Sequence, residues 1–165
     1  MPETAFLITT FATLFVVIDP PGLVPLFIAL TQGMDPAHRR RLASRACVIA
    51  FGILLVFGIA GDTILGFVGI SMPAFRIAGG ILLFLTALDM LFERRTQRRE
   101  GQKAEHDHDP SVFPLATPLI AGPGAIASVI LLVGQAGDGW GGMVAVLALV
   151  ALMLVVTFLF LRKLS

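Results

Sequence analysis

Five long apolar segments, separated by short polar connections, limit how this chain can fold. Each segment approaches or exceeds the roughly 20 residues that an α-helix needs to cross about 30 Å of hydrocarbon. The segments cover residues 5–31, 46–60 with a continuation toward 70, 73–92, 111–133 and 142–161. Only 14% of all residues are charged, whereas a soluble domain carries about 25%. The sequence therefore predicts an all-α, polytopic transmembrane helical bundle.

The basic residues are concentrated in alternate connections. Of the 12 lysines and arginines, all but Arg76 lie in residues 33–45, in residues 93–110 or in the C-terminal tail, and none lies in residues 61–72 or 134–142. Because positive charge is retained on the cytoplasmic side of a bilayer, this bias places the N-terminus outside. The net charge of only +1 gives no indication of nucleic-acid binding.

Two of the apolar segments contain a related motif. A shift of 102 residues places residues 18–32 over residues 120–134 without a gap. The pair Pro21-Gly22 then coincides with Pro123-Gly124, at the same depth of each segment. The shift passes three segments, an odd number, so the two copies must run in opposite directions. Inverted repeats with helices interrupted at matching positions are typical of transporters with a site near the bilayer midplane.

The residues of this motif predict a break in each helix. Pro20 and Pro21 lack N–H groups, and Gly22 tolerates conformations that other residues avoid. Carbonyl groups one turn earlier lose their partners, which lipid cannot replace. We therefore expect breaks near residues 19–22 and 121–124 that face each other at mid-depth. A plain proline kink, which is common in transmembrane helices, is the alternative.

Two charged side chains inside the apolar segments are candidate site residues. Asp19 lies beside the first break, where a carboxylate is costly and indicates a functional site. The alternative is that Asp19 caps the half-helix that follows it. Arg76 lies one turn after Pro73, close to the outer interface. It either snorkels to the headgroups or pairs with a substrate or a carboxylate. Asp62 is expected at the same interface.

The sequence offers no pattern of an enzyme. No histidine lies in an apolar segment and no two carboxylates are spaced to pair there, whereas catalysis needs a nucleophile and base or a metal constellation. The run His106-Asp107-His108-Asp109 resembles a metal cluster, but it lies in a hydrophilic connection and is expected to be a solvated loop. We therefore expect no enzyme activity, no cofactor and no bound metal.

Three stretches carry a resemblance to a known family. The stretches are IDPPGLVPLF, AFRIAGGILLFLTALDML and VFPLATPLIAGPGAI. Together they resemble the MarC family of bacterial integral membrane proteins, and the resemblance covers residues 9–161. Members of that family have Asn or Asp before Pro at the position of Asp19, so Asp19 matches. The family is placed with the LysE-type transporters, which implies six helices in two inverted triplets.

The resemblance also implies how the chain is divided. Residues 1–92 are expected to form the first three-helix repeat, residues 93–110 a charged cytoplasmic loop, and residues 111–165 two helices of the second repeat. A sixth helix would follow Ser165, so the second repeat is expected to be incomplete here.

The expected function is that of a small-solute or ion transporter, of the exporter type, in a bacterial inner membrane. A non-transporting membrane scaffold or partner protein is the alternative. The expected partners are the lipid bilayer, a small solute or ion and a further copy of the chain, without nucleic acid. The residues expected to bind the solute or ion are Asp19, Pro20, Gly22, Arg76, Gly122, Pro123 and Gly124.

Overall fold

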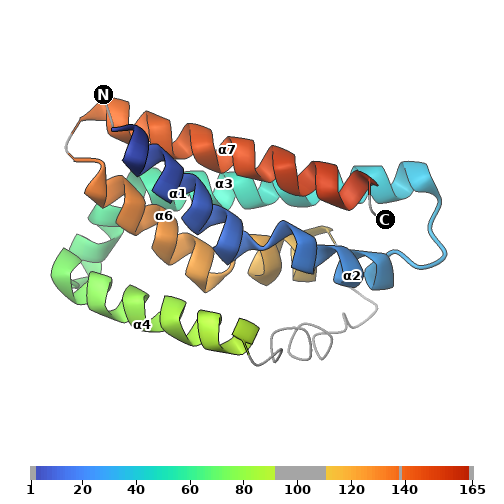
Figure 1. Ribbon diagram of the computed structural model, residues 1–165, viewed down its shortest axis with the longest axis horizontal. Coiled ribbons are helices and arrows are strands. Elements are labelled where there is room, and N and C mark those ends of the chain that lie inside the picture. Colours follow the sequence, from blue (N-terminus) through green and yellow to red (C-terminus); the bar gives the residue numbers. More distant parts are fainter. Residues whose placement is uncertain (1–2, 92–110, 138, 164–165) are drawn as a thin grey trace.

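The computed structural model describes residues 3–91, 111–137 and 139–163 and shows a bundle of helices (Figure 1). The elements in chain order are α1 (Thr4–Ile18), α2 (Pro20–Leu30), α3 (Pro36–Val68), α4 (Met72–Leu91), the π-helix η1 (Ser111–Ile120), α6 (Pro123–Gln135) and α7 (Trp140–Lys163). These described ranges contain no β-strand. The predicted all-α bundle is confirmed.

Three stretches of the described chain are long and apolar enough to cross a membrane. They are α1 with α2 (Thr4–Leu30), α3 and α7. The other two predicted spans correspond to shorter apolar helices, α6 with η1 before it and the stretch Met72–Leu85 of α4. The polytopic character that the apolar segments predict is therefore present.

Helix α3 is longer than the apolar segment that predicts it. It starts at Pro36, because Asp35 accepts hydrogen bonds from the N–H groups of Ala37 (3.1 Å) and His38 (3.2 Å). A side-chain cap followed by proline is a strong helix start. The helix ends at Gly69, which adopts φ 79°. Much of the sequence expected to form the connections 33–45 and 61–72 is thus helical.

Helices α3 and α7 form the centre of the bundle. They pack against each other, α7 also packs against α1 and α2, and α3 also packs against η1 and α6. Helix α4 lies at the periphery and packs against α6. There, a Cβ atom at Gly79 would lie 3.0 Å from Leu131 Cδ1, so the glycine permits close approach. The outward side chains Ile77 and Phe84 of α4 are exposed, as expected for a surface that meets lipid.

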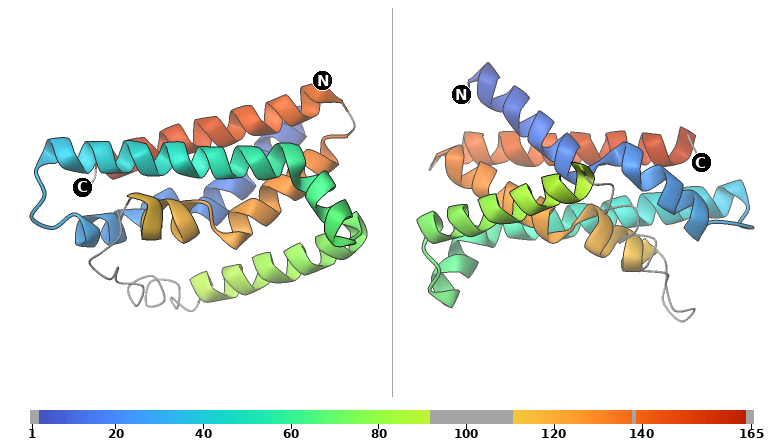
Figure 2. Two further views of the ribbon diagram at one scale, coloured as in Figure 1. Left: turned by 180° about the vertical axis from the view of Figure 1, so that it is seen from behind. Right: turned by 60° about the horizontal axis from the view of Figure 1, so that its bottom comes forward.

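The two ends of the bundle carry different connections. The N-terminus and the turns α3–α4 and α6–α7 lie at one end, and the α2–α3 turn and the C-terminus lie at the other (Figures 1 and 2). We call these the N-terminal end and the basic end. The basic end contains the first turns of α3, with Arg39, Arg40 and Arg41, and the last turn of α7, with Arg162 and Lys163. The connection 93–110, including His106–Asp109, lies outside the described residues.

Candidate functional site

The first predicted break occurs at Asp19. Helix α1 ends at Ile18, α2 begins at Pro20, and Asp19 between them has the left-handed conformation φ 54°, ψ 64°. Its N–H donates to the carbonyl of Phe15 (2.9 Å), and its Oδ1 accepts from the N–H of Gly22 (3.1 Å). The half-buried Asp19 therefore ends one helix and caps the next.

The residues after Asp19 explain why this cap forms. Pro20 and Pro21 have no N–H, so Gly22 carries the first N–H group of α2. A Cβ atom at Gly22 would overlap the Asp19 carboxylate. The sequence Asp-Pro-Pro-Gly thus places a side-chain acceptor against the first N–H donor of α2, and glycine leaves room for it. The capping role that was the alternative for Asp19 is present, and a functional role of its charge stays a prediction.

The second predicted break lies at Ala121 and Gly122, between η1 and α6. The N–H of Ala121 donates to the carbonyl of Ala116 (2.8 Å), and α6 begins at Pro123 with Gly122 as its N-cap residue. A Cβ atom at Gly122 would lie 2.5 Å from the carbonyl oxygen of Pro118. Glycine is therefore required at this break for steric reasons, and no side chain caps α6.

Both breaks lie in the interior of the bundle, midway along its length (Figures 1 and 2). The first span runs from the N-terminal end toward the basic end, and the fourth runs the opposite way. Helix α1 packs against α6, and Ile18, Pro20, Ala121 and Gly122 are all buried. The structure therefore brings the neighbourhood of Asp19 and the second Pro-Gly motif to the same depth. The inverted symmetry between two three-helix repeats stays a prediction.

Two buried hydroxyl groups on α1 and α6, the helices that adjoin the breaks, did not stand out in the sequence. Thr10 on α1 is 0% exposed and Ser128 on α6 is 1% exposed. Neither hydroxyl has a hydrogen-bond partner among the described residues. A buried, unpaired hydroxyl is costly and rare in a native structure. These side chains add polar groups to the contacting pair α1 and α6, and only their burial could have identified them.

An apolar cavity of about 540 Å³ lies beside the second break, between α3, α4, η1 and α6. Thr117, Pro118 and Pro123 form its wall at the break, and Phe75 and Gly79 contribute from α4. Asp19 does not line this cavity. The cavity therefore borders the second break but not the carboxylate at the first.

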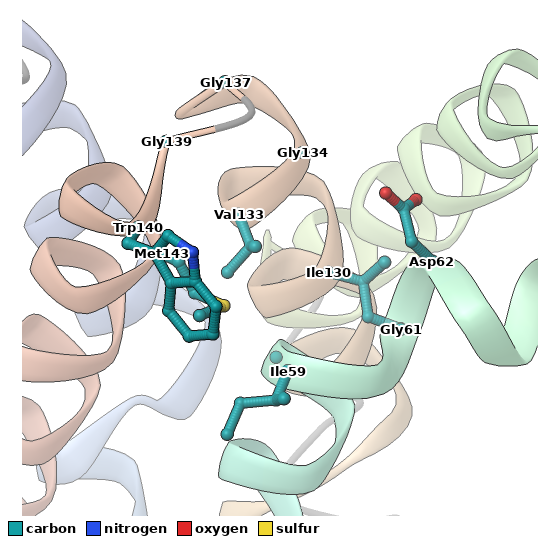
Figure 3. A pocket seen from close by; sticks show the side chains of 11 residues that line it. Ile59, Gly61, Asp62, Ile130, Val133, Gly134, Gly137, Gly139, Trp140 and Met143 are labelled. Atoms are coloured by element: carbon teal, nitrogen blue, oxygen red, sulfur yellow. The ribbon is translucent and has the colours of Figure 1, made fainter.

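A second groove, of about 380 Å³, lies at the N-terminal end between α3, α6 and α7 (Figure 3). Asp62 of α3 and Trp140 of α7 lie on opposite sides of it, with the end of α6 between them. Gly61 and Ile130 line both this groove and the apolar cavity. The structure places Asp62 at one end of the bundle, as expected. Trp140 was not identified from the sequence as a residue of a possible site.

Within the described residues, no recorded contact links Arg76 to either break. It lies on the second turn of α4 and is exposed. It lines neither of the two cavities. Its position near the end of a peripheral helix is the one that snorkelling predicts, and a role with substrate stays a prediction.

Comparison with known proteins identifies the family. The sequence model of the MarC family of integral membrane proteins matches residues 4–165. The chain belongs to the MarC family. It is therefore a membrane protein whose helices contact the lipid bilayer, as the apolar segments predict.

Similar MarC relatives occur in archaea and bacteria. A membrane protein of Archaeoglobus fulgidus is 43% identical over 137 residues, which cover 81% of this chain and 64% of the relative. The membrane protein YvbG of Bacillus subtilis is 38% identical over 162 residues, 94% of this chain and 76% of YvbG. The inner membrane protein YhgN of Escherichia coli is 35% identical over 143 residues, 87% of this chain and 72% of YhgN.

The MarC relatives are longer than the part that this chain matches, since the chain spans about two thirds to three quarters of their length. No solved structure matches the chain. Their printed names describe membrane proteins and state no substrate. The family therefore establishes the membrane location, and the function is argued from the geometry of the breaks.

Proposed function

We propose that this MarC protein takes part in moving a small solute or ion across the inner membrane. One observation carries the proposal: two helices that run in opposite directions are both broken at the same depth, and the first break carries a carboxylate. Broken helices at membrane depth are tolerated where the backbone is buried in protein or lines an aqueous path. In transporters such breaks supply backbone groups for ions and substrates.

Polar groups at the breaks and along α1 and α6 support this proposal. Asp19 supplies a full charge, Thr10 and Ser128 supply buried hydroxyls without partners, and α6 begins without a side-chain cap. A charge at membrane depth and buried hydroxyls without partners are each costly where nothing polar contacts them. The presence of Asp19, Thr10 and Ser128 on the two interrupted spans is explained if water, an ion or a solute contacts these groups during transport.

The proposed orientation has the N-terminal end outside and the basic end in the cytoplasm. It rests on the positive-inside bias of the basic end. The inner membrane is proposed because the Escherichia coli relative is named an inner membrane protein. We also propose that the chain is not an enzyme, because its apolar segments contain no histidine and no paired carboxylates.

A scaffold without transport activity is the second candidate. It is favoured by the hydrogen bond from the Gly22 N–H to Asp19, because a carboxylate that caps a helix already has a structural purpose. The two candidates make different predictions for the charge of Asp19. A cap requires an acceptor oxygen, which Asn also has, whereas binding a cation or carrying a proton requires the carboxylate.

The test compares Asp19→Asn with a matched change elsewhere. Asp35 also caps a helix through its carboxylate, but it is exposed at the basic end, so Asp35→Asn makes the same chemical change away from the breaks. Both variants and the unmodified chain are reconstituted in proteoliposomes. Uptake and efflux are then measured with a panel of amino acids, metal ions and small organic anions.

Transport by the unmodified chain and by Asp35→Asn, together with its loss in a folded Asp19→Asn variant, is the expected result. Equal transport by all three proteins would show that the charge of Asp19 has no role. Absence of flux from the unmodified chain across the whole panel, with the protein inserted and folded, would favour the scaffold.

A further inference from the structure

The groove at the N-terminal end is built from three helices that are far apart in the sequence. Helix α3 contributes Gly61 and Asp62, α6 contributes Val133, and α7 contributes Trp140 and Met143. A Cβ atom at Gly61 would lie 2.8 Å from Ile130 Cγ1, so α3 and α6 are in close contact at the floor of the groove. Its volume is about 380 Å³, within the size range of small-molecule sites.

The charge of this groove is negative. Asp62 is its one charged residue within the described chain, and no ion pair of Asp62 is present there. The last turn of α6 borders the groove, and carbonyl groups at a helix C-terminus carry partial negative charge. The N-terminus of α7 lies on the other side and offsets part of this dipole field. The carboxylate therefore dominates, and a cation is favoured.

Most of the apolar side chains that line the groove come from α6 and α7, whereas Asp62 comes from α3. Trp140 is 80% exposed, and its indole ring lies on the opposite side of the groove from the Asp62 carboxylate (Figure 3). Val133 lies between them, and Ile59 and Met143 border the same space. A ligand that contacts both sides needs a positive group at one end and an apolar body at the other.

We propose that this groove binds an amphiphilic ammonium ion, with its ammonium group at Asp62 and its apolar part against Val133, Met143 and Trp140. The ammonium group forms charge-assisted hydrogen bonds with the carboxylate. The apolar part covers side chains that otherwise face water or headgroups. The site lies apart from the helix breaks, so its occupation does not depend on transport.

Two sources of this chemistry exist at the surface of a membrane. One is a free alkylamine, and the other is the headgroup region of phosphatidylethanolamine. Both present an ammonium group attached to an apolar body. Hexylammonium represents the first source and short-chain dihexanoyl-phosphatidylethanolamine the second, with dihexanoyl-phosphatidylglycerol as the lipid without an ammonium group.

Trp140 makes the site directly observable. It is the only tryptophan of the chain, which also contains no tyrosine, so intrinsic fluorescence reports on one wall of the groove. The full chain in a nonionic detergent is titrated with each probe while fluorescence is recorded. Isothermal titration calorimetry on the same samples detects binding that leaves the fluorescence unchanged. Hexanol and hexanoate serve as neutral and anionic analogues of equal length.

The expected result is saturable binding of hexylammonium, of phosphatidylethanolamine or of both, and much weaker binding of hexanol, hexanoate and phosphatidylglycerol. Asp62→Asn should raise the Kd of the bound ammonium probe about fivefold, the scale of one ionic contact at a partly exposed site. Asp35→Asn, the same change at the basic end, should leave the Kd unchanged. Asp62 is exposed, so its replacement should not alter the unfolding midpoint, which is measured in parallel.

Three results would overturn the proposal. They are no saturable binding of either ammonium probe by fluorescence or calorimetry, equal binding of hexanol, and an unchanged Kd in the folded Asp62→Asn variant. In each case Trp140 would be an interfacial anchor of the kind that membrane proteins place at headgroup level.

Discussion

The geometry of Asp19 predicts an order of stability for four residues at this position. Asp19 has φ 54°, and its Oδ1 accepts from the Gly22 N–H at 3.1 Å. Asn tolerates the left-handed conformation and keeps an acceptor oxygen, so Asp19→Asn should change the free energy of unfolding by less than about 0.5 kcal/mol. Gly adopts the conformation freely but loses the cap, which costs a few tenths of a kcal/mol up to about 1 kcal/mol.

Alanine at position 19 loses both contributions. Removal of the cap costs about 1 kcal/mol, and holding a residue with a Cβ atom in the left-handed conformation costs about 1 kcal/mol more. Asp19→Ala should therefore lower the free energy of unfolding by about 2 kcal/mol. The Gly22 N–H, left without its acceptor in a partly buried position, adds to this cost where water does not reach it. The predicted order of stability is Asp and Asn above Gly, and Gly above Ala.

The assay is equilibrium unfolding of the four proteins in mixed micelles with increasing sodium dodecyl sulfate, followed by helix content. Asp and Asn at position 19 are expected to differ in transport, whereas Asn, Gly and Ala are expected to differ in their free energy of unfolding. The reasoning fails if Asp19→Ala is as stable as Asp19→Asn, because neither the cap nor the backbone conformation would then matter. It also fails if Gly is less stable than Ala, since that result would contradict a left-handed residue at the break.

Four further predictions concern other parts of the chain. Gly122→Ala should destabilise the fold by more than about 1 kcal/mol, because its Cβ would meet the backbone oxygen of Pro118. Gly52→Ala, on an open face of α3, should instead stabilise it by about 0.5–1 kcal/mol in the same unfolding assay. Single cysteines in residues 95–109, in a background without Cys47, should resist impermeant thiol reagents in intact cells, and ready labelling would reverse the orientation. Cys47 itself is 8% exposed in α3, so in detergent it should react with maleimide far more slowly than such a loop cysteine does, and equal rates would contradict its packing.

The helices and their breaks were predictable because they depend on local chemistry. The length of an apolar segment decides whether it can cross a bilayer, and the prolines and glycines of Asp19-Pro20-Pro21-Gly22 and Gly122-Pro123 favour a helix boundary through their own backbone chemistry. The length of α3 was underestimated, since Asp35 and Pro36 start a helix that extends beyond the apolar residues. A cap of this kind is visible in the sequence, but apolarity alone does not reveal it.

The sequence by itself determined the membrane class, the positions of the two breaks and the concentration of basic residues that the structure gathers at one end. Only the tertiary structure decided that Thr10 and Ser128 are buried without partners, that Asp62 and Trp140 border one groove, and that Arg76 is exposed on a peripheral helix. The physical reason is that lipid and protein interior are both apolar. A hydrophobic pattern therefore marks a helix as membrane-embedded without showing which face meets lipid and which meets another helix.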